Sequence, residues 1–159
     1  MPAKKLSITT LGTAAAIALL MLVIVTLPAR AAEITVYKSP YCGCCGAWVD
    51  HMRHAGHRMK VIEMEDLTAI KKMTGVGDHL QSCHTAVVDG YVIEGHVPAS
   101  EVARLLKEKP QARGLSVPGM PIGSPGMEGP DPETYDVLLF SKDGSTEVFA
   151  THQGKAARR

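Results

Sequence analysis

Residues 33–55 read EITVYKSPYCGCCGAWVDHMRHA, and this stretch joins a strand pattern to a helix pattern through a cluster of cysteines. Residues 33–38 alternate β-branched or aromatic side chains with polar ones, which predicts a strand. Residues 46–55 repeat apolar side chains at helical spacing, which predicts a helix that ends at Gly56. The cysteines therefore lie at a strand-to-helix junction.

The segments that follow continue to alternate between strand and helix patterns. They are a strand over residues 57–64, a short helix capped by Asp66, a hairpin of residues 85–88 and 91–93, and a helix over residues 101–109. The hairpin turns at Asp89-Gly90, a dipeptide suited to the positive φ angles of a primed turn. The order β-α-β-α-β-β-α combines a parallel crossover with a hairpin and predicts an α/β sheet. The thioredoxin-like architecture has this order, with its chemistry between the first strand and the first helix.

Residues 114–132 differ in kind, because ten of these nineteen residues are glycine or proline. No helix or strand is expected at that density, so the segment is predicted to be a constrained loop or a linker. A final hairpin is predicted from strands over residues 135–140 and 146–150. A frayed basic tail is predicted over residues 155–159.

The N-terminal segment has the composition of an export signal. Two lysines precede an uncharged run over residues 6–29, and Ala29-Arg30-Ala31 offers small residues where a signal peptidase cuts. An uncleaved membrane anchor is the alternative, because roughly 20 apolar residues span a bilayer. The predicted division is a leader over residues 1–31, one exported domain over residues 32–154, and the tail.

The composition excludes two classes of protein. Seventeen basic side chains nearly balance sixteen acidic ones, and the chain has only one tryptophan, four tyrosines and two phenylalanines. A strongly basic nucleic-acid binder is therefore excluded, and little is available for base stacking. Disorder of the whole chain is excluded as well, because a hydrophobic content of 45% can supply a core.

Cys42, Cys44 and Cys45 place three sulfurs within four residues. Cys42 and Cys45 alone form a C-x-x-C pair, the spacing of thiol-disulfide oxidoreductases. The amides and dipole of the helix that starts there favour thiolate over thiol. Cys44 counts against a simple redox pair, because a third thiol could attack any disulfide that formed. Three thiolates match a soft cation such as Cu(I) better, and adjacent cysteines bridge neighbouring ions more easily than they chelate one, which indicates a multinuclear site.

The fourth cysteine, Cys83, precedes His84 at the start of the predicted hairpin. In a thioredoxin-like fold this loop faces the N-terminus of the first helix, so both residues are expected across from the cluster. Two structural disulfides are the alternative, with three possible pairings, because exported cysteines commonly pair. That alternative leaves the close packing of the C-x-C-C run unexplained.

Further candidate ligands lie in turns and loops. His96 closes the hairpin at a Gly/Pro turn, and Met120 and Met127 lie in the Gly/Pro segment, where thioether ligation is predicted. Other sulfurs and imidazoles are assigned to structure: Met52, Met59 and Met73 to the core, and His51, His54 and His57 to a solvated face. A zinc-stabilised domain is a further alternative, but zinc has no use for thioethers.

Four segments together resemble the periplasmic CopG copper-resistance proteins. They are YCGCCGAW at residues 41–48, SCHT at 82–85, EGHVP at 94–98 and VPGMPIGSPGM at 117–127. The resemblance covers about residues 33–150, and it implies a thioredoxin-like domain that holds a cysteine-bridged copper cluster with a redox role in copper handling. Cys42, Cys44, Cys45 and Cys83 match the family cysteines one by one, and His84, His96, Met120 and Met127 fall in its motifs.

The resulting hypothesis is a periplasmic protein for copper resistance or handling that binds Cu(I), as a thiolate-bridged multinuclear cluster. The residues assigned to the metal are Cys42, Cys44, Cys45, Cys83, His84, His96, Met120 and Met127. The expected partners are copper ions and other periplasmic copper-handling proteins, with membrane contact only if the leader stays attached. The alternatives are a thiol-disulfide oxidoreductase that uses Cys42 and Cys45, which leaves open whether the protein is an enzyme, and the zinc-stabilised domain.

Overall fold

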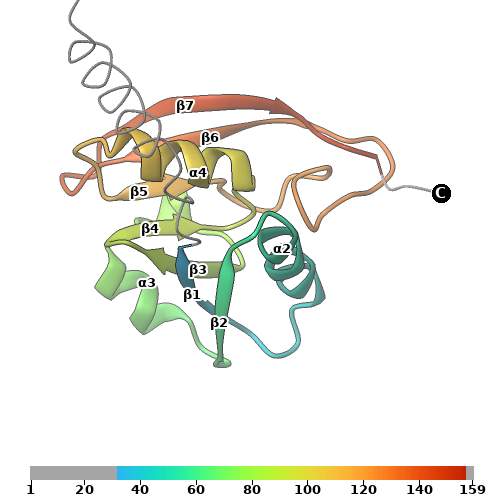
Figure 1. Ribbon diagram of the computed structural model, residues 1–159, viewed down its shortest axis with the longest axis horizontal. Helices are drawn as coiled ribbons and strands as arrows, with labels where there is room; N and C mark the ends of the chain where they lie inside the picture. Colours follow the sequence, from blue (N-terminus) through green and yellow to red (C-terminus); the bar gives the residue numbers. More distant parts are fainter. Residues whose placement is uncertain (1–31, 157–159) are drawn as a thin grey trace, which may run out of the picture. The chain divides into compact units, whose positions relative to one another are not determined.

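Residues 32–156 are described by a computed structural model, and they fold around one seven-stranded sheet with the order β2-β1-β3-β4-β5-β6-β7 (Figure 1). The elements are β1 (Glu33–Lys38), α2 (Gly43–His54), β2 (Arg58–Glu63), α3 (Thr68–Thr74), the 3-10 turn η2 (Asp78–Leu80), β3 (His84–Val88), β4 (Tyr91–Glu94), α4 (Ala99–Glu108), β5 (Gly114–Ser116), β6 (Thr134–Phe140) and β7 (Thr146–Gln153). The predicted leader over residues 1–31 lies outside the described residues. Within the described part of the chain, no helix is long and apolar enough to cross a membrane.

The predicted order β-α-β-α-β-β-α is confirmed from β1 to α4. β1 pairs in parallel with β2 and antiparallel with β3, and β3 and β4 form the predicted hairpin. Its turn residues Asp89 and Gly90 have positive φ angles of 47° and 84°, as a primed turn requires. The C-terminal hairpin is also present, as β6 and β7. Helices α2 and α4 begin earlier than predicted, at Gly43 and Ala99.

The prediction that residues 114–132 hold no helix or strand is wrong at the start of that segment. Gly114–Ser116 forms β5, which pairs in parallel with β4 and antiparallel with β6. The prolines begin only at Pro118, so these three residues keep the backbone amides that pairing needs. Gly114 is also required, because a Cβ there would overlap the carbonyl oxygen of Val92. The C-terminal hairpin is joined to the sheet through this short strand.

Helices cover both faces of the sheet. Trp48 of α2 and Leu105 of α4 belong to one buried cluster with Ile93 of β4. Val92, the neighbour of Ile93, points to the opposite face, where it packs with Leu80 of η2. Since successive strand residues point to opposite faces, the sheet separates an α2 and α4 side from an η2 side.

Helix α3 buries a different side from the one predicted. Met73 was expected in the core, but it is 76% exposed, so that prediction is wrong. The buried residues of α3 are Ile70, Lys71 and Thr74. Lys71 turns inward because its ammonium group pairs with Glu94 at the end of β4, and this orientation leaves Met73 in solvent.

The strand register brings three chain segments to one end of the sheet. Lys38, the last residue of β1, is paired with His84, the first residue of β3. Thr85 is in turn paired with Glu94, the last residue of β4. The start of α2, the residues before β3 and the turn after β4 therefore lie close together.

Candidate metal centre

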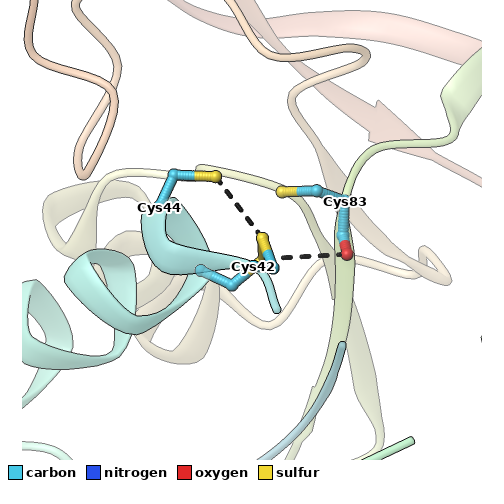
Figure 2. A group of neighbouring side chains, drawn as sticks. Cys42, Cys44 and Cys83 are labelled. Atoms are coloured by element: carbon cyan, nitrogen blue, oxygen red, sulfur yellow. Dashed lines mark hydrogen bonds between the residues drawn. A yellow bond between two sulfur atoms is a disulfide. The ribbon is translucent and has the colours of Figure 1, made fainter. Parts of the chain in front are cut away.

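The three cysteines of the C-x-C-C run lie at the N-terminus of α2 (Figure 2). Cys42 is the N-cap residue and forms a disulfide with Cys45, with an Sγ–Sγ distance of 2.00 Å. The Cys44 thiol stays free, and its sulfur lies 3.4 Å from the Cys42 sulfur. Because a disulfide sulfur carries no proton, the Cys44 thiol is the donor in this contact.

Cys83 faces this run from the residue before β3 (Figure 2). The Cys45 sulfur lies 3.8 Å from the carbonyl oxygen of Cys83, and the sulfurs of all four cysteines lie within 4.8 Å of one another. The prediction that Cys83 lies across from the cluster is therefore confirmed. The alternative of two structural disulfides is wrong for this structure, because Cys44 and Cys83 are both free thiols.

Cys83 also belongs to a second group of possible ligands, with His84 and His96. The Cys83 sulfur lies 2.9 Å from Nε2 of His96 and 3.4 Å from Nδ1 of His84. Nδ1 of His96 lies 2.8 Å from the carbonyl oxygen of Pro125. Because a carbonyl only accepts, Nδ1 carries the proton, and the lone pair on Nε2 faces the thiol.

Burial sets the protonation states in this second group. It raises the pKa of Cys83 to about 12, with the neighbouring Cys44 thiol adding to the shift. It lowers the pKa of His96, and it lowers the pKa of His84 well below its usual value. At neutral pH a protonated thiol therefore faces two neutral imidazoles. Neutral imidazole is the form that binds a metal ion, whereas the thiol must first lose its proton.

His84 packs against the buried Trp48 of α2. Its ring lies 4.4 Å from the Trp48 ring and 5.0 Å from the His96 ring, measured between centroids. Trp48 is held in place by a hydrogen bond from Nε1 to the carbonyl oxygen of Val97, at 2.9 Å. Nε2 of His84 is buried and has no hydrogen-bond partner among the described residues. A buried polar atom of this kind costs about 1–3 kcal/mol unless a ligand satisfies it.

Two solved structures, each named copper resistance protein CopG, match this chain. Form 2 is 38% identical with a TM-score of 0.74, over 77% of this chain and 99% of that one. Form 1 has the same identity and TM-score, over 79% of this chain and 100% of that one. The chain belongs to the CopG family of copper resistance proteins. This confirms the resemblance that the four sequence motifs indicated.

A family model described as "Protein of unknown function, DUF411" matches residues 80–127. None of the curated proteins matches the chain. The matched range holds Cys83, both histidines of the site and most of the Gly/Pro segment, whereas the C-x-C-C run precedes it. The CopG structures match over a much larger share of the chain, and they carry the family assignment.

The Gly/Pro segment of this CopG-family chain packs against the cysteines. The Gly119 amide donates to the carbonyl oxygen of Gln81 at 2.9 Å, two residues before Cys83. Gly126 has a φ angle of 86°, and a Cβ there would lie 2.8 Å from the carbonyl oxygen of Cys44, so glycine is required. Met120, which is 52% exposed, and the half-buried Met127 directly follow these two glycines. The assignment of their thioethers as ligands stays a prediction.

His51 departs from the solvated face predicted for the histidines of α2. It is half-buried, and its Nε2 accepts the Ala99 amide at 3.1 Å, at the start of α4. Burial lowers the pKa of His51, which favours this neutral, accepting form. Helical periodicity alone could not reveal the contact, because its partner lies on another helix.

Proposed function

We propose that this chain binds Cu(I) through the thiolates of Cys42, Cys44, Cys45 and Cys83, in a periplasmic copper-handling role. The convergence of these four sulfurs within 4.8 Å carries the proposal. Thiolates are soft ligands that select Cu(I), and the relatives named copper resistance protein support copper over other soft ions.

The proposed centre is multinuclear. Three of its sulfurs come from four successive residues at the start of α2, and sulfurs so close in the chain bridge neighbouring ions more easily than they surround one. His84, His96, Met120 and Met127 are proposed as additional ligands. The β1-to-α4 order supports a thioredoxin-like domain, in which the chemistry lies between β1 and α2.

Copper binding by all four cysteines requires reduction of the Cys42–Cys45 disulfide. Two electrons and two protons from a thiol reductant convert the disulfide into two thiols. Cu(I) then replaces thiol protons, including that of Cys83, whose pKa burial raises to about 12. Binding therefore releases protons and becomes tighter as the pH rises.

Metal analysis of protein purified anaerobically from copper-fed cells tests the proposal, with thiols counted on the same sample. We expect more than one copper per chain and four thiols titratable after copper removal. A parallel sample oxidised to the Cys42–Cys45 disulfide is the control and should retain less copper. Zinc in place of copper would contradict the proposal and favour a zinc-stabilised domain.

The Cys42–Cys45 disulfide favours a second candidate, a thiol-disulfide oxidoreductase. Cys42, the N-cap residue of α2, would be the attacking thiol of such a pair, because helix amides stabilise a thiolate there. Catalysed reduction of a disulfide substrate by copper-free protein, lost in Cys42→Ser, would support this candidate. Activity no faster than that of a free dithiol would exclude it.

The periplasmic location is proposed from the leader pattern and the family. Intact-mass measurement of the exported protein should give a chain that starts at Ala32. A full-length mass recovered from the membrane fraction would instead establish an uncleaved anchor.

A further inference from the structure

A buried ion pair lies on the face of the sheet opposite α2. Lys71 of α3 pairs with Glu94 at the end of β4, and both side chains are buried. Glu94 follows Ile93, which points toward α2, so its carboxylate points to the other side. The pair therefore does not touch the cysteine sulfurs directly.

The partners of this pair belong to the segment that carries Cys83. The Lys71 ammonium donates to the carbonyl oxygen of Ser82 at 2.9 Å and to the Thr85 hydroxyl at 3.2 Å. Oε1 of Glu94 accepts the Ser82 amide at 2.7 Å, and Oε2 accepts the Thr85 hydroxyl at 2.6 Å. Both backbone groups of Ser82 and the side chain of Thr85 are thus held by one ion pair, with Cys83 and His84 between them.

The turn after β4, which carries His96, packs against the same segment. The Gly95 amide, next to Glu94, donates to the carbonyl oxygen of His84 at 3.0 Å. Gly95 also lies so close to Ser82 that a Cβ would overlap its hydroxyl. The distance of 2.9 Å between Cys83 and His96 therefore depends on how these two segments are held against each other.

Stability alone gives little reason for a charged pair at this place. Replacing a buried ion pair by apolar side chains of similar volume is often neutral or stabilising. An apolar residue in place of Lys71 would, however, leave the Ser82 carbonyl without this partner, and one in place of Glu94 would do the same to the Ser82 amide. What the pair provides in addition to stability is a fixed position for residues 82–85.

We propose that Lys71 and Glu94 are positioning residues for the copper centre, which hold Cys83 against the sulfurs of α2 from the opposite face of the sheet. The inference rests on the proposed copper function. Neither Lys71 nor Glu94 supplies a sulfur or an imidazole, and neither contacts the sulfurs proposed to bind copper.

Three variants test the proposal by competition with a Cu(I) chelator. Lys71→Met/Glu94→Leu removes the charges and the hydrogen bonds, and should weaken copper retention about tenfold, as loss of an outer-shell partner does. Lys71→Met/Glu94→Gln keeps an acceptor for the Ser82 amide and a donor toward Thr85, and should restore most of that loss. Val92→Ala, on the same face of β4, is the control for a destabilised core that leaves these hydrogen bonds in place, and should bind copper as the parent does.

A copper-free measurement separates this inference from the proposed function. In a Cys44→Ser background with the disulfide formed, Cys83 is the single free thiol, so its alkylation rate reports on its position. The rate should rise in Lys71→Met/Glu94→Leu, fall back in the Gln variant and stay unchanged in Val92→Ala. Thr85→Val removes only the hydroxyl that bonds to Lys71 and Glu94, so it should raise the alkylation rate less. This variant replaces Lys71→Met/Glu94→Leu in the test if that protein does not fold.

Two results would overturn the inference. One is an equal alkylation rate of Cys83 in the parent, in Lys71→Met/Glu94→Leu and in Thr85→Val. The other is a copper loss in Val92→Ala as large as that in the Leu variant, which would assign the effect to stability alone. If the parent itself retains no Cu(I) while the Cys83 rates change as expected, the copper function fails and the positioning role of the pair stands.

Discussion

The two halves of the candidate metal centre, called the α2 half and the β half, are built in different ways. The α2 half takes three sulfurs from four consecutive residues, and its Gly43 and Gly46 have open space around them. The β half takes Cys83, His84 and His96 from the ends of two strands, and both imidazoles are buried. Local sequence therefore creates one half, and strand pairing creates the other.

This difference assigns different chemistry to the two halves. The α2 half contains a disulfide and a free thiol in contact, which is the arrangement from which thiol–disulfide exchange starts. The β half has a single sulfur and is held by hydrogen bonds to Pro125 and to the Lys71–Glu94 pair. We expect the oxidation state of the α2 half to control when copper binds. The rigid β half should control where it binds.

The largest expected effect comes from removing one sulfur from the α2 half or one from the β half. If the two halves form one centre, Cys83→Ser and Cys45→Ser should each lower the copper bound per chain by at least one ion. The reason is that bridging sulfurs are shared, so the loss of either one opens the cluster. Anaerobic copper loading followed by metal analysis measures this. Full copper content in Cys83→Ser would show instead that the α2 half binds copper alone.

Replacing a glycine should change the stability of the fold differently in the two halves. Gly95→Ala places a side chain at a φ angle of 73° and 2.6 Å from the carbonyl oxygen of Val117, so we expect a loss of about 2–4 kcal/mol of stability. Gly46→Ala, inside α2 with nothing nearby, should gain about 0.5–1 kcal/mol. Urea unfolding of the reduced, copper-free protein compares the two. Equal changes would refute the distinction between a locally built half and a tightly packed one.

The same distinction explains how much the sequence could predict. The strand, turn and helix around Cys42 follow from local patterns, and the position of Cys83 follows from the topology that those patterns implied. Met73 was misplaced because periodicity cannot show that Lys71 has a buried carboxylate as its partner. Strand β5 was missed because the density of glycine and proline was averaged over a segment whose first three residues contain no proline.

A pH effect on folding is expected from the buried imidazoles, and His84 in the β half should contribute most of it. The pKa of His84 is lowered chiefly by burial, and further by His96, Lys71 and Lys38, so the folded protein keeps this imidazole neutral. The unfolded imidazole titrates near pH 6.5, so below that pH the unfolded state binds more protons. Stability of the copper-free protein should therefore be lost as the pH falls below about 6.5.

Substitution separates His84 from the other histidines in this measurement. His84→Phe should reduce the decrease in the free energy of unfolding between about pH 6.5 and pH 5, because it removes the imidazole whose pKa lies well below its usual value, while His51 and His96 still contribute. His54→Gln, on the exposed surface of α2, is the matched control and should keep the parent's slope. Equal slopes in the parent and His84→Phe would show that His84 is not the group that limits stability at low pH.

The smallest expected effect concerns Met120 and Met127, which lie in the Gly/Pro segment. Gly119 is tied to the chain before Cys83, and Gly126 lies against α2, so the segment approaches both halves. Its prolines reduce the entropy lost on ordering, and neutral thioethers are weak, soft ligands suited to Cu(I) exchange. Met120→Leu/Met127→Leu roughly conserves volume and should leave thermal unfolding unchanged while speeding copper transfer to a chelator. Identical transfer in mutant and parent would mean that the methionines are not ligands and that the segment is structural or binds a partner.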